Sequence, residues 1–180
     1  MTPIQLVTLK ACEDHKDAQS FLALAETRLK TIKNRDFAWW DRTLILPGED
    51  RELETAKHLS EAHYVILLLS PNLLAAMKDR NVPRIGEIEH KLLPVMLVDV
   101  PLDGSREFHQ IDRRQIYRGP SSEGCSYNSL ESDRQRNRFV DGFVSQMIRR
   151  IDKEHRALQD AASSNLSTPR GCSRPVPVMS

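Results

Sequence analysis

Two largely apolar stretches constrain the fold of this chain more than any other feature of its sequence. The first is YVILLL at residues 64–69, and the second is LLPVMLVDV at residues 92–100. Runs of this length, bounded by polar segments, are typical of parallel strands that are buried on both faces of a sheet. They are much shorter than the roughly 20 apolar residues that a membrane span needs. The sequence therefore predicts a buried parallel sheet and no membrane partner.

Strand patterns alternate with amphipathic helix patterns along the rest of the chain. Two further short strands are predicted at residues 4–10 and 37–40, and an edge strand is predicted at residues 115–117. Apolar residues recur at helical spacing between the strands. The helices predicted from this spacing cover residues 17–33, 51–62, 72–80 and 133–160, with a short helix expected near Phe108. Such alternation predicts an α/β fold, in which helices cover both faces of a parallel sheet.

Helix starts are marked by residues that suit the first turn of a helix. Asp17 and Asp50 stand where N-caps are expected, and Ser70 followed by Pro71 provides a cap and a first helical residue. The Pro47-Gly48 pair is a strong turn signal in the segment before the second helix.

The length of the chain suits one domain followed by a tail. Of the 180 residues, 39% are hydrophobic and 28% are charged, which is ordinary for a globular protein. We assign residues 1–155 to the domain. Residues 156–180 become rich in Ser and Pro and lose their periodicity, so we expect a disordered C-terminal tail there.

Charge and cysteine content exclude several classes of protein. The formal net charge of +1 provides no field that would attract nucleic acid, so no nucleic-acid partner is expected. Cys12, Cys125 and Cys172 stand far apart, and no histidine pairs with them at metal-ligand spacing. We therefore expect reduced thiols, no metal site and, since the N-terminus does not read as a signal peptide, a cytoplasmic location.

Five segments, taken in order, resemble a Toll/interleukin-1 receptor (TIR) domain of the bacterial type. The WWDRTLILPGED segment is similar to the family's BB loop, and HYVILLLSPNLLAA is similar to its buried strand ending in Ser-Pro. The resemblance implies a flavodoxin-like five-stranded parallel sheet with helices on both faces. The matching segments are residues 15–29, 39–50, 63–76, 91–101 and 133–151.

The resemblance implies two functions of different classes. TIR domains assemble into signalling complexes through their BB loops, where this chain carries Pro47 and Gly48. Many bacterial members also cleave the nicotinamide–ribose bond of NAD, which is then a substrate and not a resident cofactor. The expected partners are further TIR copies or a separately encoded sensor or activator. The sequence leaves open whether this chain is an NAD glycohydrolase or a catalytically inactive interaction module.

Candidate residues for NAD cleavage come from the same resemblance. The enzymatic members use one glutamate on the helix after the Ser-Pro strand, and Glu87 and Glu89 are the only glutamates between Ser70 and the next strand. An ionised glutamate would stabilise the positive charge that develops on the ribose as nicotinamide leaves. Substrate binding is expected from Lys10, Trp40 and Asp41, because ligands in this class of fold lie beyond the carboxyl ends of the strands.

Other ligand-binding classes fit the sequence poorly. Glu13 and Asp14 resemble the acidic pair of a response-regulator receiver, but Ser70 stands where a receiver needs its phosphorylatable aspartate. Neither a G-x-x-x-x-G-K-[ST] nor a G-x-G-x-x-G motif is present, so phosphate-loop and Rossmann cofactor sites are not expected.

Overall fold

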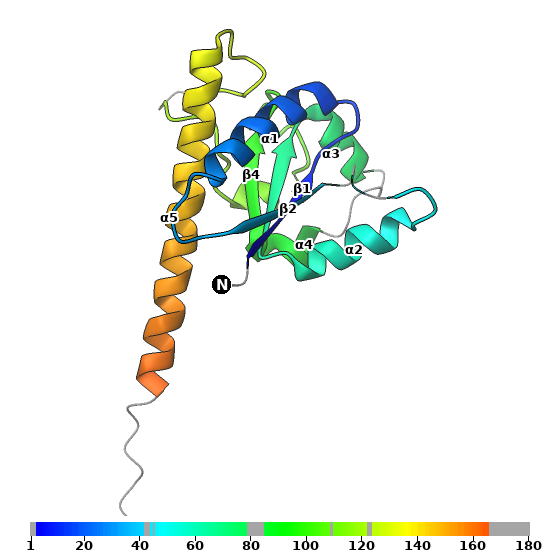
Figure 1. Cartoon of the computed structure of the whole chain (residues 1–180). Coiled ribbons are helices and arrows are strands. Elements are labelled where there is room, and N and C mark those ends of the chain that lie inside the picture. The colour runs from blue at the N-terminus through cyan, green and yellow to red at the C-terminus, as the bar shows by residue number, and fades with distance from the viewer. Residues whose placement is uncertain are drawn as a thin grey trace, which may run out of the picture. The chain divides into compact units, whose positions relative to one another are not determined.

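Four parallel strands form the central sheet of the computed structural model, which describes residues 3–41, 44, 46–78, 85–108, 110–121 and 124–165 (Figure 1). The order across the sheet is β2-β1-β3-β4. The strands are β1 (Ile4–Leu9), β2 (Phe37–Asp41), β3 (Tyr64–Leu69) and β4 (Leu92–Met96). The predicted α/β class with a parallel sheet is confirmed.

The two apolar runs behave as their composition predicts. Every residue of β3 and of β4 is buried, and β3 pairs with β1 on one side and with β4 on the other. β4 is shorter than predicted, ending at Met96.

The predicted fifth strand is reduced to a single parallel bridge between Val95 and Tyr117. Tyr117 donates its N–H to Pro94 O at 2.8 Å and accepts from Met96 N at 2.9 Å. Gly119 follows with a φ of +81°. Pro120 then has no N–H to donate, so the extended pairing cannot continue.

On one face of the sheet, helices α2 (Arg51–Glu61) and α3 (Pro71–Lys78) are joined by α4 (Ile85–Ile88) and the short 3-10 helix η2 (Glu89–Lys91). Apolar side chains from these elements meet those of the strands in one buried cluster. Its largest members include Leu59, Leu67, Leu69, Leu73, Ile88, Leu92 and Met96, and residues after β4 such as Phe108 and Ile111 extend it.

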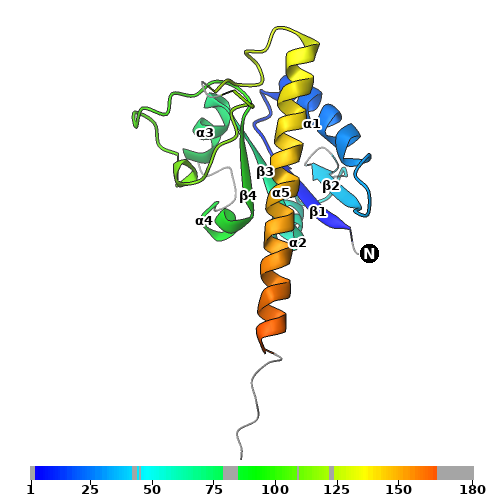
Figure 2. The same cartoon turned by 90° about the vertical axis from the view of Figure 1, so that its left-hand side faces the viewer.

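The opposite face carries α1 (His15–Leu29) and the first turns of α5 (Asp133–Asn165), which is yellow there in Figure 2. Aromatic rings hold this layer together. Phe21 lies 5.4 Å from Phe143 and 6.3 Å from Phe139, measured between ring centroids. Tyr117 donates its hydroxyl to Phe139 O at 2.7 Å, and burial raises the pKa of that phenol, so it remains protonated and able to donate.

Helix starts agree with the predictions at two of three places. The Asp50 carboxylate accepts from Glu52 N and Leu53 N, and the Ser70 hydroxyl accepts from Leu73 N at 3.0 Å, so both residues are caps. The cap predicted at Asp17 is wrong, since α1 begins at His15 after Asp14. The segment 72–80 predicted for the third helix forms α3 as far as Lys78, and residues 79–84 lie outside the described part.

The contacts divide the chain into two units, residues 1–145 and 146–180. Within the second unit, α5 continues to Asn165, and residues 153–163 are exposed. The helix therefore includes residues 156–165, the first part of the segment that the sequence predicts to be a disordered tail. Ala, Leu, Arg and Gln favour this propagation, because extending an existing helix costs far less than starting one. Residues 166–180, the remainder of the predicted tail, are not among those described.

Candidate functional site

The carboxyl ends of the four strands meet at one edge of the sheet, because all the strands are parallel. The residues that leave this edge are Lys10 after β1, Asp41 at the end of β2, Ser70 after β3 and Leu97 after β4. Ligands in open α/β sheets bind beyond this edge. A ligand-binding site is therefore expected at this edge.

Lys10 and Asp41, two of the predicted substrate-binding residues, form an ion pair at this edge. Lys10 Nζ lies 2.7 Å from Asp41 Oδ2, and the two side chains are only 11% and 15% exposed. The strand register brings them together, since Asp41 pairs with Thr8, two residues before Lys10. The pair is shielded enough that removing either partner would leave a poorly solvated charge.

Trp39 and Trp40 point to opposite faces of β2, as neighbouring residues of a strand must. Trp40 stacks on His58 of α2 with ring centroids 4.2 Å apart, and it packs against the buried cluster of that face. Trp39 donates its Nε1–H to Thr8 Oγ1 at 2.6 Å. Trp40, the predicted substrate-binding tryptophan, therefore has a packing role in the structure.

A buried carboxylate that sequence reasoning did not place in a site lies next along this edge. Asp14 is 8% exposed and accepts hydrogen bonds from the Ser70 hydroxyl and from Asn72 Nδ2, the latter at 2.7 Å. Asp17 accepts from Asn128 Nδ2 at 2.9 Å. Asp14 thus ties the loop after β1 to the start of α3. The sequence signal for this contact was the turn Ser70-Pro71-Asn72 after a buried strand. The hydroxyl of Ser70 and the side-chain amide of Asn72 are donors that need an acceptor.

Glu87 and Glu89, the predicted catalytic residues, lie at the other end of the sheet. They belong to α4 and η2, which directly precede β4, and Figure 1 shows α4 near the tails of the strands. Glu89 pairs with Arg114, with Oε1 3.0 Å from Nη2, while Glu87 is exposed. The structure therefore does not bring either glutamate to Lys10 and Asp41. The reason is topological, since a segment that leads into a parallel strand must lie at its amino end.

The loop that carries Pro47 and Gly48 is a defined turn whose described residues are exposed. Leu46 N donates to Glu49 Oε2 at 2.8 Å, Glu49 N donates to Leu46 O at 3.2 Å, and Gly48 has a φ of +95°. The turn then passes into the Asp50 cap of α2. Three large apolar side chains around it face solvent: Leu44 is 59% exposed, Leu46 is 64% exposed and Leu53 is 66% exposed.

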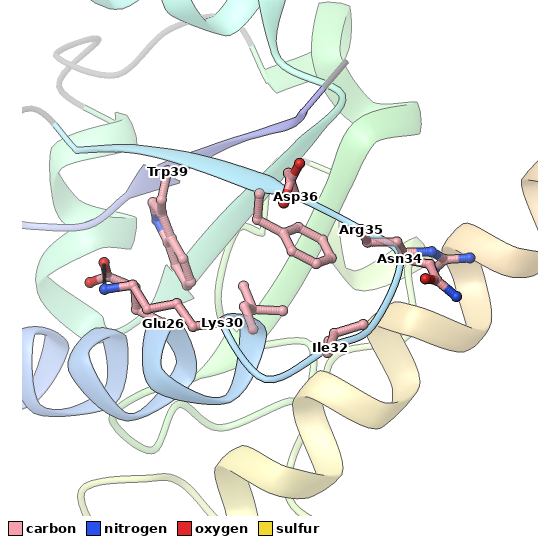
Figure 3. Close-up of a pocket in the computed structure, with 9 residues that line it drawn as sticks. Glu26, Lys30, Ile32, Asn34, Arg35, Asp36 and Trp39 are labelled. Carbon is pink, nitrogen blue, oxygen red and sulfur yellow. Dashed lines mark ion pairs between the residues drawn. The ribbon is translucent and has the colours of Figure 1, made fainter. Parts of the chain in front are cut away.

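A cavity of about 450 Å³ lies elsewhere, between the end of α1 and β2 (Figure 3). Its apolar lining comes from Leu29, Ile32, Phe37 and Trp39. The rest of the lining is polar. It consists of Asn34 and four charged residues, Glu26, Lys30, Arg35 and Asp36. The cavity adjoins the outer strand of the sheet and does not include Lys10 or Asp41.

No cluster of three or more His, Cys, Asp or Glu side chains that could hold a metal ion occurs among the described residues. No helix within the described ranges is long and apolar enough to cross a membrane.

Comparison with known proteins gives no further guide: no family model, no curated protein and no solved structure matches the chain.

Proposed function

We propose that this chain is a TIR-type signalling module that assembles through the loop between β2 and α2. The observation that carries the proposal is the group of exposed leucines at Leu44, Leu46 and Leu53. Of the five large apolar side chains exposed among the described residues, these three stand within ten positions of one another. Single exposed leucines are common, whereas a group within one short segment is typical of an interaction surface.

The proposed fold is the flavodoxin-like TIR fold, with the bridge at Tyr117 in the place of the fifth strand. The order β2-β1-β3-β4 followed by that bridge supports this assignment. The loop that resembles the BB loop then corresponds to residues 41–50. Its position after β2 is the one that the resemblance implies.

The turn at residues 46–50 is held by hydrogen bonds, which supports an assembly role. The Glu49 side chain and the Asp50 cap fix the backbone of this turn, so little conformational entropy is lost there when a partner binds. The partner would be a second copy of the chain or a separately encoded activator in the cytoplasm, and it would meet the leucines through an apolar patch.

Substitutions in the loop test this proposal. Leu46→Asp is expected to weaken self-association by at least about tenfold, because a buried leucine contributes roughly 1.5–3 kcal/mol and about 1.4 kcal/mol is tenfold in affinity. Pro47→His is expected to weaken it as well, by changing the exposed turn without touching the core. The measurement is sedimentation velocity over a range of protein concentrations. Circular dichroism checks that each variant keeps its fold.

Leu158→Asp is the matched control. Leu158 is 69% exposed on α5, which is close to the exposure of Leu46, but it lies far from the loop in sequence. The control is expected to sediment like the unchanged chain. Equal loss of association in Leu46→Asp and Leu158→Asp, or no loss in Leu46→Asp, would contradict the assignment of the loop.

Hydrolysis of NAD at the nicotinamide–ribose bond is the second candidate function. One observation favours it: the shielded Lys10–Asp41 pair lies at the sheet edge where ligands of α/β folds bind. The positions of Glu87 and Glu89 before β4 favour the assembly function instead. The two functions are separable, because neither glutamate belongs to the loop that carries the leucines.

A further inference from the structure

The cavity between the end of α1 and β2 presents apolar surface to solvent. Phe37 and Trp39 line it from β2, and Leu29 and Ile32 line it from the end of α1 and the segment that follows. In Figure 3 the Trp39 ring points from β2 toward α1. Of these four side chains only Leu29 is buried, while the other three are partly exposed. An apolar group that entered the cavity would remove this surface from water.

The cavity has room for leucine side chains. Its volume is about 450 Å³. An engineered apolar cavity of about 150 Å³ is large enough to bind benzene, and a leucine side chain has fewer carbon atoms than benzene. The volume is therefore sufficient for one leucine of a partner, with space left for a second.

The chain carries exposed leucines on a different surface. Leu46 is 64% exposed, and none of the exposed leucines of residues 44–53 lines the cavity. Strand β2 separates the two features, because the segment 30–36 leads into Phe37 and the leucine loop leaves from Asp41. Figure 1 shows these two connections at opposite ends of the strand. In the folded chain the leucines and the cavity of one copy therefore do not meet, whereas those of two copies can.

Charge favours contact between these two different surfaces. The segment 46–54 contains four acidic residues and one basic residue. The segment 30–36 beside the cavity contains three basic residues and one acidic residue, and it keeps a positive excess when Glu26, the partner of Lys30, is included. Two leucine surfaces would bring like charges together, while a leucine surface and a cavity bring opposite charges together. The cavity is therefore the better partner for the leucines.

We propose that Leu46 of one copy of this chain enters the cavity of a second copy, between Ile32 and Trp39. The proposal rests on the proposed function and names the surface that its leucines contact. The contact joins two different surfaces, so each pair of copies keeps one cavity and one group of leucines for further copies. Contacts of this heterologous kind build a ring when the rotation closes and an open row of copies when it does not.

Two variants of the full chain, each lacking one of the two surfaces, test the proposal by mixing. Leu46→Asp removes the leucine and keeps the cavity, whereas Ile32→Glu places a carboxylate in the cavity and keeps the leucines. Each variant alone is expected to associate at least about tenfold more weakly than the unchanged chain in sedimentation velocity. An equimolar mixture of the two is expected to regain one contact and to form a dimer that does not grow further.

Ala23→Glu is the matched control for Ile32→Glu. Ala23 is exposed on α1 and does not line the cavity, so the same change in charge is expected to leave association as it is in the unchanged chain. Circular dichroism checks the fold of every variant. If Ile32→Glu does not fold, Ile32→Trp takes its place, because it fills the cavity without adding a charge.

The outcomes separate this proposal from the proposed function. Unchanged association of a folded Ile32 variant, equal weakening in Ala23→Glu, or a mixture that associates no better than its components would overturn the cavity as the partner surface. Each of these results is compatible with assembly through the leucines. An unchanged chain that stays monomeric at every concentration, or a Leu46→Asp chain that associates normally, would instead contradict the proposed function and this proposal with it.

Discussion

Phe21→Ala is expected to lower the free energy of unfolding by about 3–5 kcal/mol, the range for removing a fully buried phenylalanine. Phe21 is 0% exposed and joins three other rings of the α1 layer. Its ring centroid lies 5.5 Å from that of Tyr127, in addition to its contacts with Phe139 and Phe143. Alanine would leave a cavity that these rigid rings cannot fill by a small movement. A chain of this size should then melt roughly 10 °C lower, since about 1 kcal/mol corresponds to roughly 2–4 °C.

Leu158→Ala is the control for this prediction. Its side chain is 69% exposed, so the free energy of unfolding should change by less than about 0.5 kcal/mol. Denaturant unfolding followed by circular dichroism measures both variants. A cost below about 1 kcal/mol for Phe21→Ala would show that the α1 layer is not packed as described.

The second large effect is expected on the rate at which nicotinamide is released from NAD. If the chain cleaves NAD by the route that the family resemblance implies, Glu87→Gln should reduce the release on the order of a hundredfold or more. This is the usual loss when one preorganised electrostatic group is removed from a catalytic site. Glu89→Gln is the companion variant, and it also removes the partner of Arg114. The experiment follows nicotinamide from concentrated protein incubated with NAD, with and without a crowding agent.

The outcomes separate the two candidate functions. Loss of release in one of the two glutamine variants, with sedimentation unchanged, would support the glutamate as a catalytic residue. Release that survives both substitutions would exclude Glu87 and Glu89, and it would direct attention to Asp14 and Asp41 at the carboxyl edge of the sheet. No release under any of these conditions would leave the assembly function alone.

Local composition was enough to predict the parallel sheet and two helix starts. The runs at β3 and β4 carry no charged residue and are almost wholly apolar, which favours burial on both faces of a sheet. Asp50 and Ser70 cap helices because a short polar side chain directly before a helix satisfies its first N–H groups. Both kinds of signal depend on neighbours in sequence.

The parts that could not be predicted depend on contacts between distant residues. Asp14 meets Ser70 and Asn72 across more than fifty positions, and nothing near Asp14 in the sequence indicates this. The sequence assigns Glu87 and Glu89 to the segment before the fourth strand. The end of the sheet at which they lie depends on where β4 begins, which is a property of the folded chain. The shortening of the fifth strand to one bridge follows from the turn at Gly119 and Pro120.

The central claim, assembly through the loop between β2 and α2, is tested most directly by amide hydrogen exchange at low and high protein concentration. Backbone amides that become buried in a contact exchange more slowly, and the exchange of each segment can be followed separately. The account predicts slower exchange at high concentration in residues 44–53, and loss of that protection in Leu46→Asp. A chain that associates while the exchange of residues 44–53 stays unchanged, or one that stays monomeric at every concentration, would contradict the account.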